Sequence, residues 1–513
     1  MLAPARPKPT FILSVPTKPD KATPHDENCF DSNDSRRGTL DAGESVDFEG
    51  RKLTKSNLRA SVADGATFGV MVGAGESYFA AFALAVGLGE VSAGLVSSVP
   101  LLAGGVLQLI SLRAVKWIGS EKRWIVLCSA MQALAFVPLV IAAVTGSVSL
   151  GALLVIASVY WAGGLAGGPA WNTWIEVIVP RKIRPRYFAR RTRISQFMTL
   201  IGLVGGGALL QWAEASGQTL AGFACLFVIA GMFRMWSVYW LARHQTPSVV
   251  STRATRSSLG RSRTDRSAKG DATPYAGNGM AVSGVRLLAY LVMVQGMVQV
   301  SGPYFASYML EELQYSYASF VTLLAAGFLA KVAALNAWVT VAHRGGAKML
   351  LWIGGVGIVP LASLWIVSQN FYWLIAVQIL SGTMWAAYEL GFFLLFFEAL
   401  PIERRTRMLT YYNLANTSAW CAGALIGAWL LKSNGVGETG YYVLFGISSL
   451  GRLAALGLLF GANFRSVPVL RVCMRILGVG PALATLDSPI LPTLDEVERS
   501  DALEDQLTVT AAA

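Results

Sequence analysis

Long blocks of apolar residues, in which charged side chains are rare, run through most of this chain. Two of them read WIVLCSAMQALAFVPLVIAAV, from Trp124, and LWIGGVGIVPLASLWIV, from Leu351. Runs of about 18 or more apolar residues can cross a hydrocarbon core about 30 Å thick as helices. Only 14% of the 513 residues are charged, whereas a soluble domain carries roughly 25%. The sequence therefore predicts an all-α membrane protein and not a large soluble helical one.

Dividing the chain at its polar breaks gives twelve predicted spans. Their approximate limits are 60–86, 90–112, 123–145, 149–178, 194–213, 218–242, 286–310, 316–342, 347–367, 371–399, 408–432 and 440–463. Helix is the expected conformation, because lipid offers the backbone no hydrogen-bond partners and no barrel-type alternation occurs. Lys and Arg are concentrated in one set of loops and Glu in the opposite set. The positive-inside bias therefore predicts that both termini are cytoplasmic.

Polar segments at the ends and in the middle suggest the domain order. The predicted parts are a disordered N-terminal tail (1–55), a six-helix bundle (56–244), a basic linker (245–285), a second six-helix bundle (286–464) and a C-terminal tail with an interfacial helix and an acidic end (465–513). The net charge of +12 is explained by topology and by contact with the membrane surface. It does not require a nucleic-acid partner. The five cysteines and three histidines show no metal-ligand spacing, so no metal or cofactor is expected.

One spacing of proline, arginine and glycine occurs twice. The first copy contains Pro180, Arg184, Arg186, Gly202 and Gly206, and the second, 221 residues later, contains Pro401, Arg405, Arg407, Gly423 and Gly427. Other pairs recur in the same order, namely Tyr78 with Tyr304 and Gly119 with Gly345 at an offset of 226, and Arg234 with Arg452 at an offset of 218. Chance explains an ordered series of this kind poorly. It predicts two six-helix halves that face the same way, as in transporters built from parallel repeats.

These features resemble the major facilitator superfamily over about residues 56–464. The segment PAWNTWIEVIVPRKIRPRYFARR, from Pro169, resembles the loop between helices four and five of bacterial members. Gly119, Lys122 and Arg123 are similar to the signature between helices two and three, although its Asp is missing here. Gly207 stands where the helix-five antiporter signature has a proline, so no subfamily is assigned. The resemblance implies secondary active transport through a cavity lined by helices one, four, seven and ten.

Charged residues deep inside predicted spans are costly unless they are paired or hydrated, and such residues often mark functional sites. Lys331 and Glu389 lie at similar depth in spans eight and ten, which are neighbours in the superfamily, so we expect them to form an ion pair. The pair is either a static structural contact or a group that gains and loses a proton. Glu76 has no cation in its own span. It is either a protonated packing residue or a site for proton coupling or for a cationic substrate.

Other candidates fall into three groups. Residues expected to line the cavity are Trp161, Asn172, Gln295, Gln299, Trp385, Tyr388, Asn413 and Asn416. Residues expected to form a cytoplasmic gate of ion pairs are Glu176, Arg184, Arg186, Glu398, Arg405 and Arg407. The alternative is that the arginines only fix the orientation of the chain in the membrane. Residues expected to interrupt helices four and seven are Gly168 with Pro169 and Gly302 with Pro303. Arg234 and Arg452 are expected to extend along their helices toward the cytoplasmic surface.

The leading functional hypothesis is a secondary active transporter of a small molecule, driven by protons and working as a monomer in the cytoplasmic membrane. The sequence has no phosphate-binding loop, so drive by ATP is not expected. One alternative is a receptor or scaffold on a transporter fold. Another is a flippase for a lipid or amphiphile. An enzyme is not expected, because no nucleophile and base occur together inside the spans.

Overall fold

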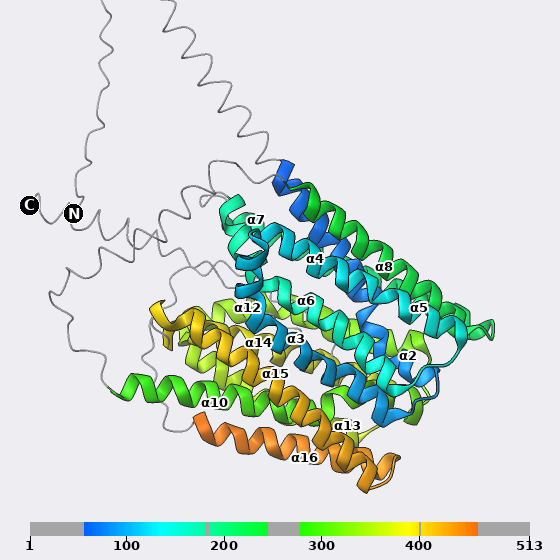
Figure 1. Cartoon of the computed structure of the whole chain (residues 1–513). Helices are drawn as coiled ribbons and strands as arrows, with labels where there is room; N and C mark the ends of the chain where they lie inside the picture. Colours follow the sequence, from blue (N-terminus) through cyan, green and yellow to red (C-terminus); the bar gives the residue numbers. More distant parts are fainter. Residues whose placement is uncertain (1–55, 180–183, 245–277, 400–401, 460–513) are drawn as a thin grey trace, which may run out of the picture. The chain divides into compact units, whose positions relative to one another are not determined.

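The computed structural model describes residues 56–179, 184–244, 278–399 and 402–459 (Figure 1). Within these ranges the backbone is helical apart from short turns, and it contains no strand. Nine helices in the described ranges are long and apolar enough to cross a membrane. The prediction of an all-α, multi-pass membrane protein is therefore confirmed. Both predicted tails, and the linker up to residue 277, lie outside the described residues, and the domain boundaries stay predictions.

The first half supplies the first six spans. Its elements are a helix over residues 56–74, η1 (Glu76–Tyr78), α2 (Phe79–Ala85), α3 (Glu90–Ile118), α4 (Glu121–Leu134), α5 (Phe136–Thr145), α6 (Leu150–Ile178), α7 (Arg184–Ala215) and α8 (Thr219–Arg243). Residues 56–85 together make the first span, and α4 with α5 makes the third.

The second half supplies the remaining spans. Its elements are α10 (Asn278–Ser301), η3 (Gly302–Tyr304), α11 (Phe305–Ser307), η4 (Tyr308–Glu312), α12 (Tyr317–Gly357), α13 (Leu364–Val367), α14 (Phe371–Ala399), α15 (Ile402–Ser433), α16 (Glu438–Leu456) and η5 (Gly457–Leu459). Gly346 divides α12, because its φ of 76° and ψ of 168° are not helical, and a positive φ favours glycine. With this division, the described residues provide a helix for each of the twelve predicted spans.

The first helix of each half is interrupted at the same place. A 3₁₀ turn occurs at Glu76–Tyr78 and again at Gly302–Tyr304, 226 residues later. The tyrosine that ends each turn makes a matching hydrogen bond: Tyr78 donates its hydroxyl proton to the carbonyl oxygen of Leu203, and Tyr304 donates to that of Ala424 at 2.6 Å. The two halves thus share geometry as well as sequence.

The repeated glycines allow the fifth helix of each half to approach the first. A Cβ atom on Gly206 would lie 2.7 Å from the Tyr78 ring, and one on Gly427 would lie 2.6 Å from the Tyr304 ring. Gly202 is equally close to the carbonyl oxygen of Val70, because a Cβ there would lie 2.6 Å away. Small residues at this spacing let helix backbones pack closely in lipid.

The fourth helix does not end at its predicted interruption. Helix α6 continues through Pro169 to Ile178. A proline removes one backbone hydrogen bond and crowds the preceding turn. A proline inside a helix can bend it without ending it, so the kink predicted at Gly168 and Pro169 stays a prediction. The interruption predicted at Gly302 and Pro303 is present as a 3₁₀ turn.

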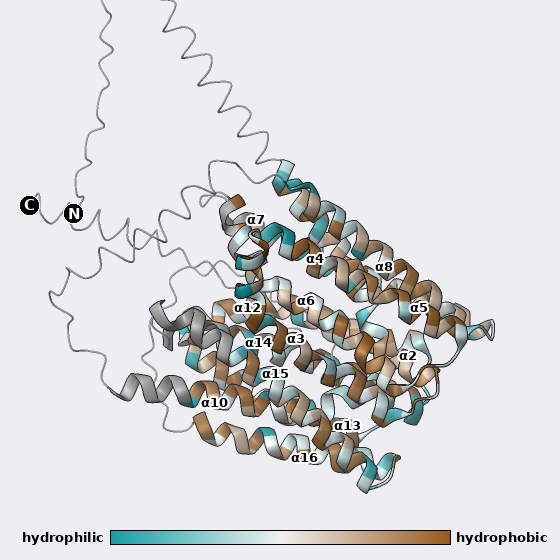
Figure 2. Cartoon of the chain, in the orientation of Figure 1, coloured by the Kyte–Doolittle hydropathy of each residue, from teal (hydrophilic) through white to brown (hydrophobic). Residues whose placement is uncertain are grey.

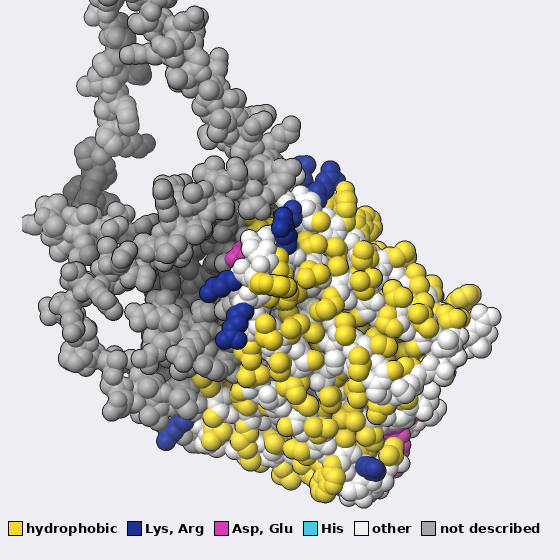
Figure 3. Space-filling view, in the orientation of Figure 1, with side chains coloured by type: hydrophobic (Ala, Val, Ile, Leu, Met, Phe, Trp, Pro, Cys, Tyr) yellow, Lys and Arg dark blue, Asp and Glu magenta, His cyan; other side chains and the backbone are white. Residues whose placement is uncertain are grey.

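The described surface is suited to lipid. Apolar residues extend along the outer faces of the helices (Figure 2), and Leu134, Val144, Val155 and Leu450 are each more than 60% exposed. Lys and Arg side chains gather at one end of the helices, beside a broad apolar surface (Figure 3). Apolar surface exposed on this scale marks contact with a membrane or a partner, and the span lengths favour a membrane.

Candidate functional site

Helices α12 and α14 pack with their backbones in close contact. A Cβ atom on Gly382 of α14 would overlap the carbonyl oxygen of Gly327 and would lie 2.9 Å from the backbone nitrogen of Lys331. Beyond the break at Gly346, in the segment of α12 that makes the ninth span, a Cβ on Gly354 would overlap the backbone of Tyr388. The missing side chain at Gly382 lets α14 approach the segment of α12 before Gly346, and this approach brings Lys331 opposite Glu389.

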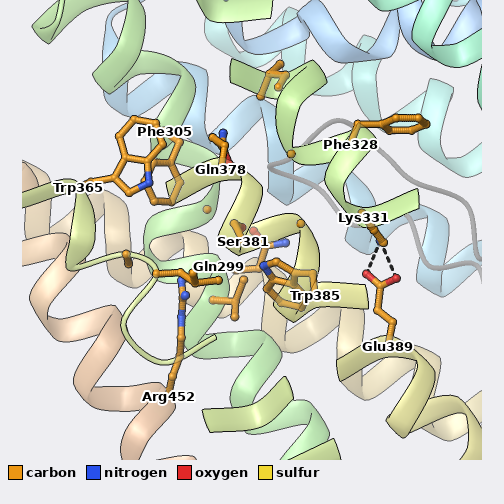
Figure 4. A pocket seen from close by; sticks show the side chains of 17 residues that line it. Gln299, Phe305, Phe328, Lys331, Trp365, Gln378, Ser381, Trp385, Glu389 and Arg452 are labelled. Carbon is orange, nitrogen blue, oxygen red and sulfur yellow. Dashed lines mark hydrogen bonds and ion pairs between the residues drawn. The ribbon is translucent and has the colours of Figure 1, made fainter. Parts of the chain in front are cut away.

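Lys331 and Glu389 form a buried ion pair. The Nζ atom of Lys331 lies 2.6 Å from both carboxylate oxygens of Glu389, and the two residues are 6% and 4% exposed (Figure 4). The contact expected from depth along the spans is therefore present. Removing one partner of a buried pair leaves an uncompensated charge, which destabilises the folded protein. Each of the two residues can therefore stay charged here only while the other is its partner.

The ion pair lies at the wall of a cavity of about 100 Å³ inside the second half. Gln299 and Trp385, both expected cavity residues, line it as well (Figure 4). Aromatic rings cover much of the remaining wall, including Phe305 and Trp365, whose ring centroids are 4.9 Å apart. A concave site with an apolar lining and few polar groups is the usual form of a small-molecule site.

Replacing Gly382 with alanine is expected to separate α12 from α14 and to weaken the ion pair. The added Cβ would overlap the Gly327 carbonyl, and overpacking of this kind costs about 1–3 kcal/mol. We expect a lower Tm for the detergent-purified variant. Gly205→Ala is the matched control, because a Cβ at that helical position has no atom within 4 Å. Equal Tm values for the two variants would contradict the close contact.

The two halves meet at the ends of the helices that are predicted to face outside. Glu90, the first residue of α3, accepts a hydrogen bond from the Tyr441 hydroxyl of α16 through its carboxylate. Its backbone oxygen accepts another from Ser307 at 3.3 Å. Gln211 of α7 accepts a hydrogen bond from the backbone of Ala318 at 3.0 Å. These three contacts, which we call the outer closure, join the first half to the second.

Several solved structures that are similar to this chain are transporters by their descriptions. No family model matches the chain, and no curated protein sequence does. A bacterial homologue of the iron transporter ferroportin, in an inward-facing state, is 15% identical with a TM-score of 0.58, and the match covers 80% of this chain and 98% of that one. A POT family peptide transporter is 11% identical with a TM-score of 0.60, covering 81% and 98%. A D-xylose–proton symporter is 15% identical with a TM-score of 0.56, covering 80% and 98%.

The chain has the major facilitator fold. Twelve helices in two parallel six-helix halves are thereby confirmed. The residues that line the described cavity all belong to the second half, whereas the resemblance implies a cavity between the halves, which stays a prediction. Trp161 of the first half is buried against Tyr160, with ring centroids 5.4 Å apart, and it does not line the cavity.

The other expected cavity residues are dispersed through the major facilitator fold. Gln295 and Asn416 are buried with side-chain oxygens that have no hydrogen-bond partner. Tyr388 is buried between the rings of Tyr290 and Trp385. Asn413 is half-buried. The structure therefore groups Gln299 and Trp385 with the ion pair and leaves these residues elsewhere. The side chain of Asn172 lies outside the described residues.

The predicted cytoplasmic gate cannot be placed. The side chains of all six gate residues lie outside the described residues: Glu176, Arg184, Arg186, Glu398, Arg405 and Arg407. The backbone positions of Glu176 and Glu398 are at the ends of α6 and α14, and the arginines belong to the first turns of α7 and α15. The gate stays a prediction.

Glu76 is buried in the first half, in the 3₁₀ turn that interrupts the first helix. One carboxylate oxygen accepts a hydrogen bond from the Tyr160 hydroxyl at 2.7 Å, and the other is buried with no partner. No ion pair to Glu76 occurs among the described side chains. An unpaired charge in such a place is costly, which favours a neutral carboxylic acid. The structure does not bring Glu76 into the cavity of the second half.

A polar network in the first half was missed from the sequence. Asp64 forms an ion pair with Arg191 at 2.9 Å and accepts a hydrogen bond from Ser237 at 2.7 Å. Ser237 in turn accepts from Arg234 at 2.7 Å. Arg191 ends the basic segment that begins at Pro169 and resembles a loop, and Arg234 is expected from the sequence to extend toward the cytoplasmic surface. That expectation is wrong for both matching arginines, because Arg234 and Arg452 are 6% and 3% exposed. The sequence does contain one signal for this network: Asp64 is an acidic residue inside the first predicted span, where a charge needs a partner.

Proposed function

We propose that this chain is a secondary transporter that moves a small solute across a membrane by alternating access. The observation that carries the proposal is the outer closure, which joins the two halves of the major facilitator fold at one end. Parallel halves of this kind move as units around a site between the two membrane surfaces. The cavity in the second half offers a place for a solute. The Lys331–Glu389 pair at its wall offers charges whose pairing a bound solute or proton can change.

The outer closure has the chemistry of a reversible contact. It consists of a few polar bonds at Glu90, Gln211 and Ser307, and a typical hydrogen bond contributes about 0.5–1.5 kcal/mol net. A few such bonds can be exchanged for bonds to water when the halves separate. We infer that the described conformation is closed toward the outside and that an opposite conformation opens there.

The Lys331–Glu389 pair is the proposed coupling element in the second half. A proton on Glu389 would neutralise the carboxylate and leave the Lys331 ammonium without a counter-ion inside the protein. Because a lone buried charge is unfavourable, the protonated form would favour a conformation in which Lys331 reaches water or a solute. Proton binding would thereby be linked to rearrangement of α12 and α14. Glu76 is a second candidate for proton binding, in the first half.

We propose that the protein lies in a cytoplasmic membrane, with both termini on the cytoplasmic side, and that it works as a monomer. The solved structures that are similar to this chain include a proton symporter and a peptide transporter by their descriptions. We propose a small-molecule substrate on that basis. A scaffold function would instead require the linker and the tails.

Reconstitution tests the proposal. The purified chain is first screened against a metabolite library by thermal shift, because a ligand stabilises the form that binds it. The solute with the largest shift is then used, radiolabelled, in proteoliposomes with an imposed proton gradient. We expect accumulation that a protonophore abolishes, and at least a tenfold loss of accumulation in Glu389→Gln with counterflow retained. Accumulation that is equal in the wild type and in liposomes without protein would contradict transport.

A further inference from the structure

The two matching buried arginines have different electrostatic surroundings. In the first half, Arg234 is connected through Ser237 to the carboxylate of Asp64. The position that corresponds to Asp64 at the offset of 226 is Tyr290, and the position that corresponds to Ser237 at the offset of 218 is Ala455. The second half therefore keeps the cation and loses the acid that balances it.

Arg452 makes its hydrogen bonds to neutral groups. It donates to the carbonyl oxygen of Ile358 at 2.9 Å and to the hydroxyls of Ser301 and Ser448 at 3.1 Å each. No described carboxylate forms an ion pair with it. Its Nε atom is buried with no hydrogen-bond partner, and the residue is 3% exposed. A buried charge without a counter-ion is unfavourable, so an anion at this place would stabilise the protein.

The guanidinium of Arg452 is positioned at the cavity. Arg234 donates to Ser237, one turn farther along its helix, whereas Arg452 donates to Ser448, one turn back. The two arginines thus have different partners on their own helices. Arg452 lines the cavity that also contains Gln299 and Trp385, and it extends toward them (Figure 4).

The cavity wall is rich in hydrogen-bond donors. Besides Arg452, the amides of Gln299 and Gln378 and the hydroxyl of Ser381 line it, and each of these groups can donate a proton. The charges of Lys331 and Glu389 cancel each other, so the charged groups described at this wall sum to one positive charge. Phe305 and Trp365 add an apolar surface. The cavity volume of about 100 Å³ is below the 150 Å³ or so that holds benzene, so the ligand must be small.

We propose that the second half contains a binding site for a small monoanion, a short-chain monocarboxylate, with Arg452 as its counter-ion. The carboxylate balances the charge of Arg452 at the cavity wall, a role that Asp64 has for Arg234 in the first half, and the short apolar tail contacts the aromatic wall. The site goes beyond the transport proposal, because binding of the anion can be measured whether or not the chain transports it.

Thermal shift with propionate tests the site. The detergent-purified full chain is titrated with sodium propionate, and sodium gluconate, a bulky polyol carboxylate, keeps the ionic strength constant. Binding to the folded state raises the Tm in a saturable way, and we expect a rise of about 2–4 °C. Gluconate should give no saturable rise. An identical response to propionate and gluconate, or no response to propionate, would overturn the proposal.

Two variants and one control locate the effect. Arg452→Gln should lose the propionate shift. Ser301→Asp places a carboxylate at the position that already accepts a hydrogen bond from Arg452. It should therefore raise the Tm without propionate and abolish the further shift. Arg234→Gln, the matching change in the first half, should keep the shift whatever its starting Tm. If Arg452→Gln does not fold, Ser301→Asp decides, and a wild-type propionate shift in that variant contradicts the site.

Discussion

Lys331→Met is expected to destabilise the protein by about 3–5 kcal/mol, because it leaves the buried carboxylate of Glu389 without its cation. Both carboxylate oxygens of Glu389 lie 2.6 Å from the Lys331 Nζ atom, so the whole counter-charge is removed at once. The measurement is equilibrium unfolding of the purified variant in detergent, or its Tm.

The double variant Lys331→Met with Glu389→Leu separates charge from packing. Replacing a buried ion pair with apolar residues of similar size is often neutral or stabilising by about 1–4 kcal/mol. The double variant should therefore recover the stability that the single variant loses, while it loses any proton response. Lys432→Met makes the same chemical change at an exposed position and should stay within about 0.5 kcal/mol of wild type. A stable Lys331→Met variant would contradict a charged pair.

Glu76→Gln is expected to remove the response of the first half to pH while preserving its fold. Glutamine keeps an oxygen that can accept the Tyr160 hydrogen bond, now 2.7 Å long, and it cannot ionise. A neutral amide suits a site in which the second carboxylate oxygen has no partner. We therefore expect a wild-type Tm and loss of any pH-dependent change in the distance across the outer closure.

The measurement uses spin labels on the exposed residues Ser216 and Glu311, in a background without the native cysteines, at pH 5.5 and pH 8. Wild type should show a shift in the distance distribution between these pH values, and Glu76→Gln should not. Tyr160→Phe removes only the hydrogen-bond donor and is the matched control, which should retain a pH response. An unchanged pH response in Glu76→Gln would show that Glu76 is not the responding group.

The fold was predictable because its signals are local and repeated. Apolar blocks set the spans, and the offset of 226 residues between Tyr78 and Tyr304 indicates two halves in the sequence itself. The structure adds the reason for the repeat: each tyrosine bonds a carbonyl of the fifth helix in its own half. Gly202 and Gly206 serve the same close packing of the fifth helix against the first.

The site was predictable only in part. Depth along two spans was enough to pair Lys331 with Glu389. Depth does not tell in which direction a side chain leaves the helix. Arg234 and Arg452 were expected to extend toward the cytoplasmic surface, but both are buried. Arg191 follows a run of loop cations in the sequence, and nothing local shows that it faces Asp64. The cavity likewise depends on the directions of side chains from many helices.

Reciprocal motion of the two ends of the molecule is the most direct test of the alternating-access account. A first pair of spin labels, at the exposed Ser216 and Glu311, reports on the outer closure. A second pair, at the exposed Arg113 and Arg344, reports on the last turns of α3 and on the segment of α12 just before the break at Gly346. Across pH and added solute, the account predicts that the outer distance lengthens when the inner distance shortens. Two distances that stay fixed under all these conditions, or that lengthen together, would contradict it.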